Sequence, residues 1–291
     1  MHIHSYKIAF IETENLNMSI LQQVKKPEAK APMITIIGSA GTGKTSLAGL
    51  FPKPLFIQAE SGDAVFESWD EDVRPNILSV EGKKTPYLFL LDVVRELYNS
   101  EHDYETVVID SITALNLLME KEIVDDPDEK ATNIADACGG YQKGFIESAQ
   151  RHAQLIRSFD LLRKHKNMTI VFLGHSNIIK MKNSPEESSE YAVFGLDMHQ
   201  KSAANYINNC DAVLYLTKEK FITGAETNKK TGATTKFGRA TESGNRILIT
   251  SGDGKTGYIS AKNRYDLDPE IAVPQGTNPL LTQIKFFNTQ A

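Results

Sequence analysis

The sequence predicts an α/β fold in which a mostly parallel β-sheet is flanked by helices. Apolar runs of strand length, rich in β-branched residues, recur along the chain and alternate with longer stretches of helical spacing. These runs are almost continuously hydrophobic, which is typical of parallel strands that are buried on both faces. The length of 291 residues suits one large domain, or one domain with small attachments.

The expected elements follow in chain order. Strands are expected at residues 34–37, 55–59, 106–110, 169–173 and 212–216. Helices are expected at residues 47–50, 86–99, 111–124, 141–166, 203–209 and 279–288. The polar, serine-rich stretch 180–197 predicts a loop. Near the end, residues 246–250 and 257–261 flank the turn-like stretch 251–256 and predict a C-terminal β-hairpin.

Composition places the chain among globular proteins with one main domain. Its 291 residues are 41% hydrophobic and 24% charged. Residues 1–32 are expected to form an N-terminal extension and linker, and residues 33–291 the domain. The net charge of −5 means that any nucleic-acid binding must come from local patches.

Cysteine usage and hydropathy indicate a cytoplasmic protein. Cys138 and Cys210 form neither a metal-ligand spacing nor a disulfide framework, which fits a reducing compartment. We expect no membrane association, because no apolar stretch is long enough to span a bilayer. The first residues also lack the order of a signal peptide.

The most informative segment has the pattern of a phosphate-binding loop, G-x-x-x-x-G-K-[ST], between an expected strand and an expected helix. Its backbone would bind the phosphates of ATP through residues Gly38, Ser39, Ala40, Gly41, Thr42, Gly43, Lys44, Thr45 and Ser46. Lys44 would reach the β- and γ-phosphates, and the Thr45 hydroxyl would bind Mg²⁺. The alternative is a glycine turn that holds a lysine by chance.

Two acidic residues end expected strands beside this loop. Asp110 would hold Mg²⁺ through water, although an aspartate at that point can also cap the following helix. Glu60 could orient or deprotonate the water that attacks the γ-phosphate. Its spacing alone also fits a solvated surface carboxylate.

From residue 33 to residue 216, the order of segments resembles the ATPase core of RecA-type recombinases. That family has a strand ending in Ala-Glu, matched by Ala59-Glu60, and a magnesium strand ending in Asp-Ser, matched by Asp110-Ser111. The resemblance implies that Glu60 activates water and that His175 senses the γ-phosphate. RecA has glutamine at the latter position, so His175 is a departure from the family pattern. A histidine there could instead form only local hydrogen bonds.

Within this superfamily the chain looks most like compact RecA-core ATPases that bacteriophages encode for recombination. The acid-ended strand at 52–60 and the late Lys262-Asn263-Arg264 carry this resemblance. It implies a homo-oligomer, a ring or a filament, in which Lys262 and Arg264 act at the neighbouring subunit's γ-phosphate. On an extended strand both cations would face one side. An exposed basic strand end is the alternative.

The resemblance implies an ATP-dependent protein that binds single-stranded DNA and promotes annealing or strand exchange in the host cytoplasm. A single-strand-binding protein is a further expected partner. By position, DNA would contact segments 125–140 and 176–201, although the mixed charges of the latter also fit ordinary surface. The alternative is a helicase-loader-like ATPase that acts on a protein partner. A small-molecule kinase is disfavoured because segment 177–197 contains no arginine.

Overall fold

The structure is a computed structural model that describes residues 21, 24, 26, 29–181, 191–223, 226–227, 234–236, 239–251 and 261–288. Within these residues the strands are β1 (Met33–Gly38), β2 (Pro54–Gln58), β3 (Asn76–Ser79), β4 (Thr106–Asp110), β5 (Thr169–Met181), β6 (Tyr191–Leu196), β7 (Ala212–Thr223), β8 (Glu226–Thr227), β9 (Thr234–Lys236), β10 (Arg239–Ile249), β11 (Lys262–Asn263) and β12 (Glu270–Val273). The helices are α1 (Lys44–Gly49), α2 (Pro86–Asn99), α3 (Ile112–Val124), α4 (Lys143–His165), α5 (Gln200–Asn209), α6 (Leu280–Gln283) and α7 (Lys285–Asn288).

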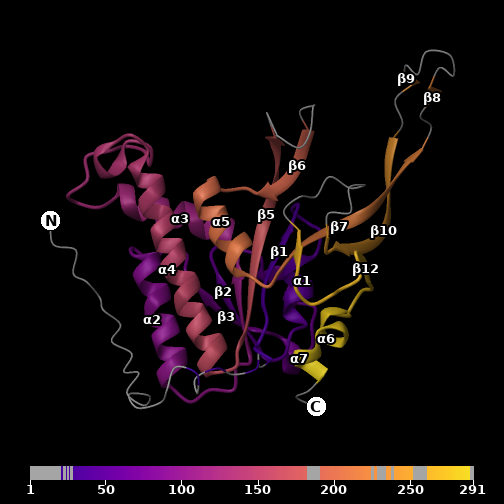
Figure 1. Cartoon of the computed structure of the whole chain (residues 1–291), viewed down its shortest axis with the longest axis horizontal. Coiled ribbons are helices and arrows are strands. Elements are labelled where there is room, and N and C mark those ends of the chain that lie inside the picture. The colour runs from indigo at the N-terminus through magenta and orange to yellow at the C-terminus, as the bar shows by residue number, and fades with distance from the viewer. Residues whose placement is uncertain are drawn as a thin grey trace.

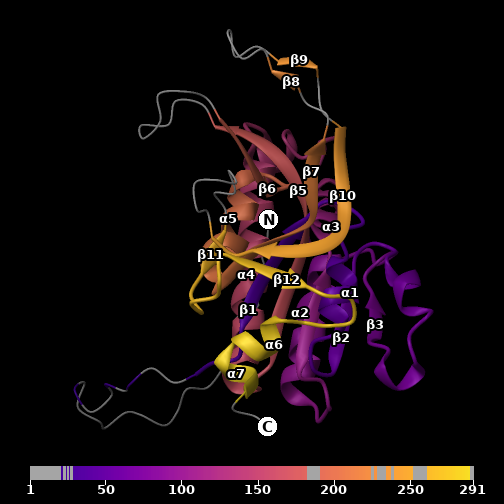
Figure 2. The same ribbon diagram turned by 90° about the vertical axis from the view of Figure 1, so that its right-hand side faces the viewer.

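A 10-stranded sheet forms the centre of the molecule, with the main order β12-β10-β7-β1-β5-β4-β2-β3. From β7 to β3 the strands are parallel, whereas β6, β10, β11 and β12 pair antiparallel. Helices α2 to α5 cover one face, and α1, α6 and α7 cover the other (Figures 1 and 2). The predicted α/β fold, a mostly parallel sheet flanked by helices, is confirmed.

Strand register brings distant parts of the sequence to one edge of the sheet. Gly38 is level with His175, and Gln58 is level with Asp110. Because β1, β2, β4 and β5 all run in the same direction, the carboxyl ends of β1, β2 and β4 meet at this edge, beside His175 in the middle of β5. Residues at or just after the strand ends are therefore brought to the same site.

One expectation about secondary structure is wrong in part, and another lies largely outside the described residues. The expected loop at 180–197 is wrong in part, because Tyr191–Leu196 forms β6 against the end of β5. Most of the turn and second arm of the expected C-terminal hairpin, residues 252–260, lies outside the described residues. Its first arm pairs with β7 and β12. Ala31, expected in the linker, is buried in the core on the α1 face.

Candidate functional site

The phosphate-binding loop links β1 to α1 at the carboxyl edge. Gly41 and Gly43 have φ values of 73° and 92°, in the left-handed region that favours glycine. Gly38 is needed for space, since a Cβ built there would lie 2.4 Å from the Leu216 carbonyl oxygen. The glycines of the motif therefore meet backbone requirements of this loop.

Lys44 lies across the start of the loop. Its Nζ donates hydrogen bonds to the carbonyl oxygens of Gly38, at 2.9 Å, and Ser39, at 3.0 Å. Burial lowers the pKa of Lys44, and the nearby carboxylates of Asp110 and Glu60 oppose that shift. The ammonium group is thus partly desolvated and close to two acids, an environment that suits binding of a phosphate.

The Thr45 and Asp110 side chains lie in direct contact, as is expected of two residues that bind one Mg²⁺ ion. The Thr45 hydroxyl donates to Asp110 Oδ2 at 2.7 Å. Asp110 is buried, and burial raises its pKa while the hydrogen bond from Thr45 opposes the rise. Ser111 is the N-cap of α3, because its side chain accepts from the Ala114 N–H. The capping alternative for Asp110 is therefore wrong.

These oxygen donors fit Mg²⁺. The ion prefers one or two protein oxygens completed by water and phosphate oxygens. Among the residues that the structure describes, no cluster of three or more His, Cys, Asp or Glu side chains could hold a metal. Thr45 and Asp110, which are hydrogen-bonded to each other, would hold the ion together with the nucleotide.

Glu60 and His175 are joined by a hydrogen bond across the site. Glu60 Oε1 lies 2.8 Å from His175 Nε2, and both side chains are about one-third exposed, at 37% and 33%. The hydrogen bond from His175 is the main cause that lowers the pKa of Glu60, and burial opposes it. The structure thus brings together the expected water-activating residue and the expected γ-phosphate sensor.

Comparison with known proteins decides the family. The profile of a family described as "AAA domain" matches residues 30–265. The chain belongs to this AAA-domain family. Its phosphate-binding loop is therefore the nucleotide-binding loop of a P-loop NTPase domain.

A solved structure is similar to this AAA domain. The crystal structure of the RadB recombinase is similar to it at 15% identity, with a TM-score of 0.40, over 76% of this chain and 81% of the other. No curated protein matches it significantly. Within its described residues, no helix is both long enough and apolar enough to span a membrane.

Arg246 of the AAA domain also reaches the phosphate-binding loop. A Cβ built at Gly43 would lie only 2.6 Å from Arg246 Nη1. The same arginine lines a groove of about 1420 Å³, here called the α1 groove, whose walls include Ser46, Trp69 and Gly276. No motif in the sequence points to Arg246 as a site residue. The one sequence feature that marks it is its position as a basic residue at the start of the apolar run 246–249.

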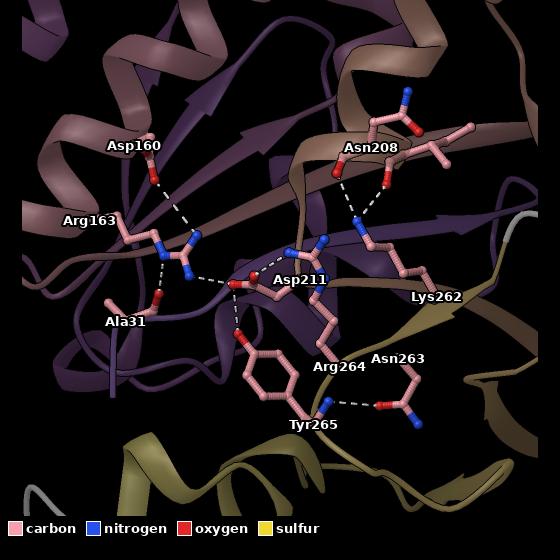
Figure 3. Close-up of polar contacts among 10 residues, drawn as sticks. Ala31, Asp160, Arg163, Asn208, Asp211, Lys262, Asn263, Arg264 and Tyr265 are labelled. Carbon is pink, nitrogen blue, oxygen red and sulfur yellow. Dashed lines mark hydrogen bonds and ion pairs between the residues drawn. The ribbon is translucent and has the colours of Figure 1, made fainter. Parts of the chain in front are cut away.

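Lys262 and Arg264 lie away from the phosphate-binding loop of their own chain. Lys262 pairs with Val213 near the start of β7, at the amino edge of the sheet, whereas the loop follows the carboxyl end of β1. Lys262 Nζ donates to the carbonyl oxygens of Ile207, at 3.3 Å, and Asn208, at 2.8 Å (Figure 3).

Arg264 follows directly after β11 and is held loosely. Its Nη1 lies 3.5 Å from Asp211 Oδ1, and its side chain is 58% exposed. Asp211 also accepts hydrogen bonds from Arg163 and from the Tyr265 hydroxyl (Figure 3). The expected strand ends at Asn263, so the two cations are not on one strand. Their role at a neighbouring subunit stays a prediction.

Proposed function

We propose that this AAA domain hydrolyses Mg·ATP, with Glu60 activating the attacking water and His175 contacting the γ-phosphate. The observation that carries the proposal is the hydrogen bond between Glu60 and His175, level with the loop and the Thr45–Asp110 pair. Hydrolysis needs a group that orients water and cations that stabilise the charge on the γ-phosphate. Both kinds of group converge on one edge of the sheet.

The γ-phosphate and Glu60 would compete for the hydrogen bond of His175, and this competition would link nucleotide binding to hydrolysis. In the structure Nε2 of His175 is engaged by Glu60. A γ-phosphate that accepts a hydrogen bond from His175 releases the Glu60 carboxylate toward water. Bound Mg²⁺ would supply charge neutralisation at the phosphate oxygens, and Lys44 would bind the β- and γ-phosphates.

The first test is nucleotide binding by a Lys44→Ala variant. Calorimetric titration with Mg·ATP is expected to show strong binding by the wild type and little or none by Lys44→Ala. Lys121→Ala is the matched control, because Lys121 is 70% exposed and pairs with Asp125 on the surface of α3. Wild-type affinity in a folded Lys44→Ala variant would reject the assignment.

We further propose that hydrolysis serves single-strand annealing or strand exchange on DNA. The segment between α3 and α4 and the β5–β6 ribbon lie toward the same end of the molecule (Figure 1). Tyr141, just after the expected DNA segment 125–140, is 94% exposed and thus open to base stacking. Phe194, an aromatic residue of the other expected DNA segment, 176–201, is packed on Tyr215 with ring centroids 5.1 Å apart.

DNA-stimulated hydrolysis separates this role from that of a helicase-loader-like ATPase. Single-stranded DNA is expected to raise the ATPase rate, and Tyr141→Ala to reduce the stimulation without changing the basal rate. Leu88→Ala, at a position of α2 that is 40% exposed, is a control that should leave the stimulation intact. A rate that does not respond to DNA would favour a protein partner.

We also propose that the active assembly is a homo-oligomer in which Lys262 and Arg264 act on the neighbour's nucleotide. Their position at the amino edge and the exposure of Arg264 support this. Arg264→Ala should bind nucleotide but hydrolyse it poorly. Mixing it with Lys44→Ala should restore some activity, since one mixed interface has both an intact loop and an intact arginine. Full activity of Arg264→Ala alone would remove the proposal.

A further inference from the structure

A β-bulge aims Arg246 at the phosphate-binding loop. The register between β10 and β7 shifts between Glu242 and Arg246, and Gly244 within the shift has a φ of 83°. After the bulge, β10 pairs regularly, with Arg246 opposite Lys218 on β7 and Val273 on β12. Bulges of this kind redirect side chains and are frequent beside active sites.

The guanidinium group of Arg246 lies against the residue that precedes Lys44. A Cβ at Gly43 would lie 2.6 Å from Arg246 Nη1, 3.4 Å from its Cδ and 3.6 Å from its Cζ. The arginine can approach this closely only because position 43 is glycine. The conformation of the loop, with Gly43 at a φ of 92°, and the position of Arg246 therefore depend on the same residue.

Arg246 has no anionic partner among the residues that the structure describes. Its one hydrogen bond there is a long one, from Nη2 to the Pro274 carbonyl oxygen at 3.4 Å. The acids beside it on the two strands are engaged elsewhere. Glu219 accepts from Ser243 and Asn245, and Glu242 pairs with Lys218 at 3.1 Å. A half-buried guanidinium with most of its donors unused is suited to bind an anion.

The α1 groove begins where a nucleotide would leave the loop. A nucleotide whose phosphates bind the loop amides must extend from the loop to its ribose and base. Ser46, directly after the motif, already lines the groove. Arg246 and the turn residues Pro274 and Gly276 line the same groove. Trp69 also lines it and is packed on Phe66 with ring centroids 5.0 Å apart.

We propose that Arg246 contacts the nucleotide bound to its own chain, at the α-phosphate and ribose, where the nucleotide passes from the loop into the α1 groove. This inference rests on the proposed nucleotide binding. It adds a contact from within the chain to the cations that Lys262 and Arg264 are proposed to supply from a neighbour. It also places the nucleoside near Trp69.

Titration of the full chain with Mg·ADP tests the contact. Trp69 is the single tryptophan of the sequence, so its fluorescence reports on the groove, and calorimetry gives the affinity independently. Arg246→Ala is expected to bind Mg·ADP about tenfold or more weakly, because a charge-assisted hydrogen bond to phosphate is lost. Arg95→Ala is the matched control, since Arg95 is 57% exposed and pairs with Asp92 on α2. It should bind as the wild type does.

The outcomes distinguish a direct contact between Arg246 and the nucleotide from a role of Arg246 in supporting the phosphate-binding loop. A contacting arginine raises the KM for ATP in the Ala variant and leaves kcat within a few-fold. A parallel fall of kcat, or wild-type affinity in a variant that melts normally, would overturn the inference. If Arg246→Ala has a lower melting temperature than the wild type, the same criteria are applied to Arg246→Gln. That variant keeps much of the side-chain packing but removes the charge. Failure of the wild type to bind Mg·ADP or Mg·ATP at all would instead reject the proposed function.

Discussion

His152 makes the stability of the protein depend on pH in a calculable way. The ring is fully buried in α4, between α3 and α5. Its Nε2 lies 3.0 Å from Asn116 Oδ1, and its Nδ1 lies 2.7 Å from the Tyr206 hydroxyl. Since Oδ1 can only accept, the neutral ring donates from Nε2 and accepts from Tyr206 at Nδ1. Burial lowers the pKa of His152 to about 3.

Protonation of His152 favours the unfolded chain. A histidine in an unfolded chain has a pKa of about 6.5, so the unfolded state binds the proton first as the pH falls. The stabilising contribution is complete above that pH and is lost progressively toward the folded-state pKa near 3. Between pH 7 and pH 5 this linkage removes about 2 kcal/mol from the free energy of unfolding.

Denaturant unfolding at pH 7 and pH 5 measures this loss in the wild type and in His152→Gln. The variant is less stable at both pH values, but its loss between them should be smaller by about 2 kcal/mol. His165→Gln is the control for the loss of a histidine as such, because His165 is exposed at the end of α4. Equal pH dependence in the wild type and His152→Gln would refute the reasoning.

Three further substitutions test the site and its support. Glu60→Gln should bind Mg·ATP yet hydrolyse it about 10²- to 10⁴-fold more slowly in a phosphate-release assay, and unchanged turnover would make Glu60 a surface carboxylate. Gly38→Ala should weaken nucleotide binding and lower the melting temperature, because its Cβ would lie 2.4 Å from the Leu216 carbonyl oxygen. Asp211→Ala should lower the free energy of unfolding by about 1–3 kcal/mol, since Arg163 and the Tyr265 hydroxyl lose a hydrogen-bond acceptor while Arg163 keeps Asp160 at 3.7 Å. A denaturant midpoint equal to that of the wild type would contradict the last prediction.

The sequence predicts best the elements whose residues are buried, because burial leaves a recognisable pattern of apolar residues. The strand segments that lead to Gly38, Asp110 and His175 are buried on both faces, so their apolar runs are unbroken. Because parallel strands bring their carboxyl ends to one edge, the sequence also placed Glu60, Asp110 and Lys44 together.

What the sequence missed depends on tertiary contacts. Strand β3 is an edge strand with mostly exposed residues, such as Ile77 at 38%, and therefore lacks a burial pattern. Strand β6 follows a long polar run that conceals its short alternating pattern. The Glu60–His175 bond joins residues 115 positions apart, and Arg246 reaches the loop through a bulge. Neither contact leaves a local signal.

Strand β5 continues without a break from the centre of the sheet to the ribbon it forms with β6. His175 lies in the middle of this strand, level with Gly38, and the pairing with β6 begins at the next residue, Ser176. The backbone that holds His175 at the proposed γ-phosphate site is therefore the same backbone that forms one arm of the ribbon. The proposed catalytic site and a distant surface share a single uninterrupted strand.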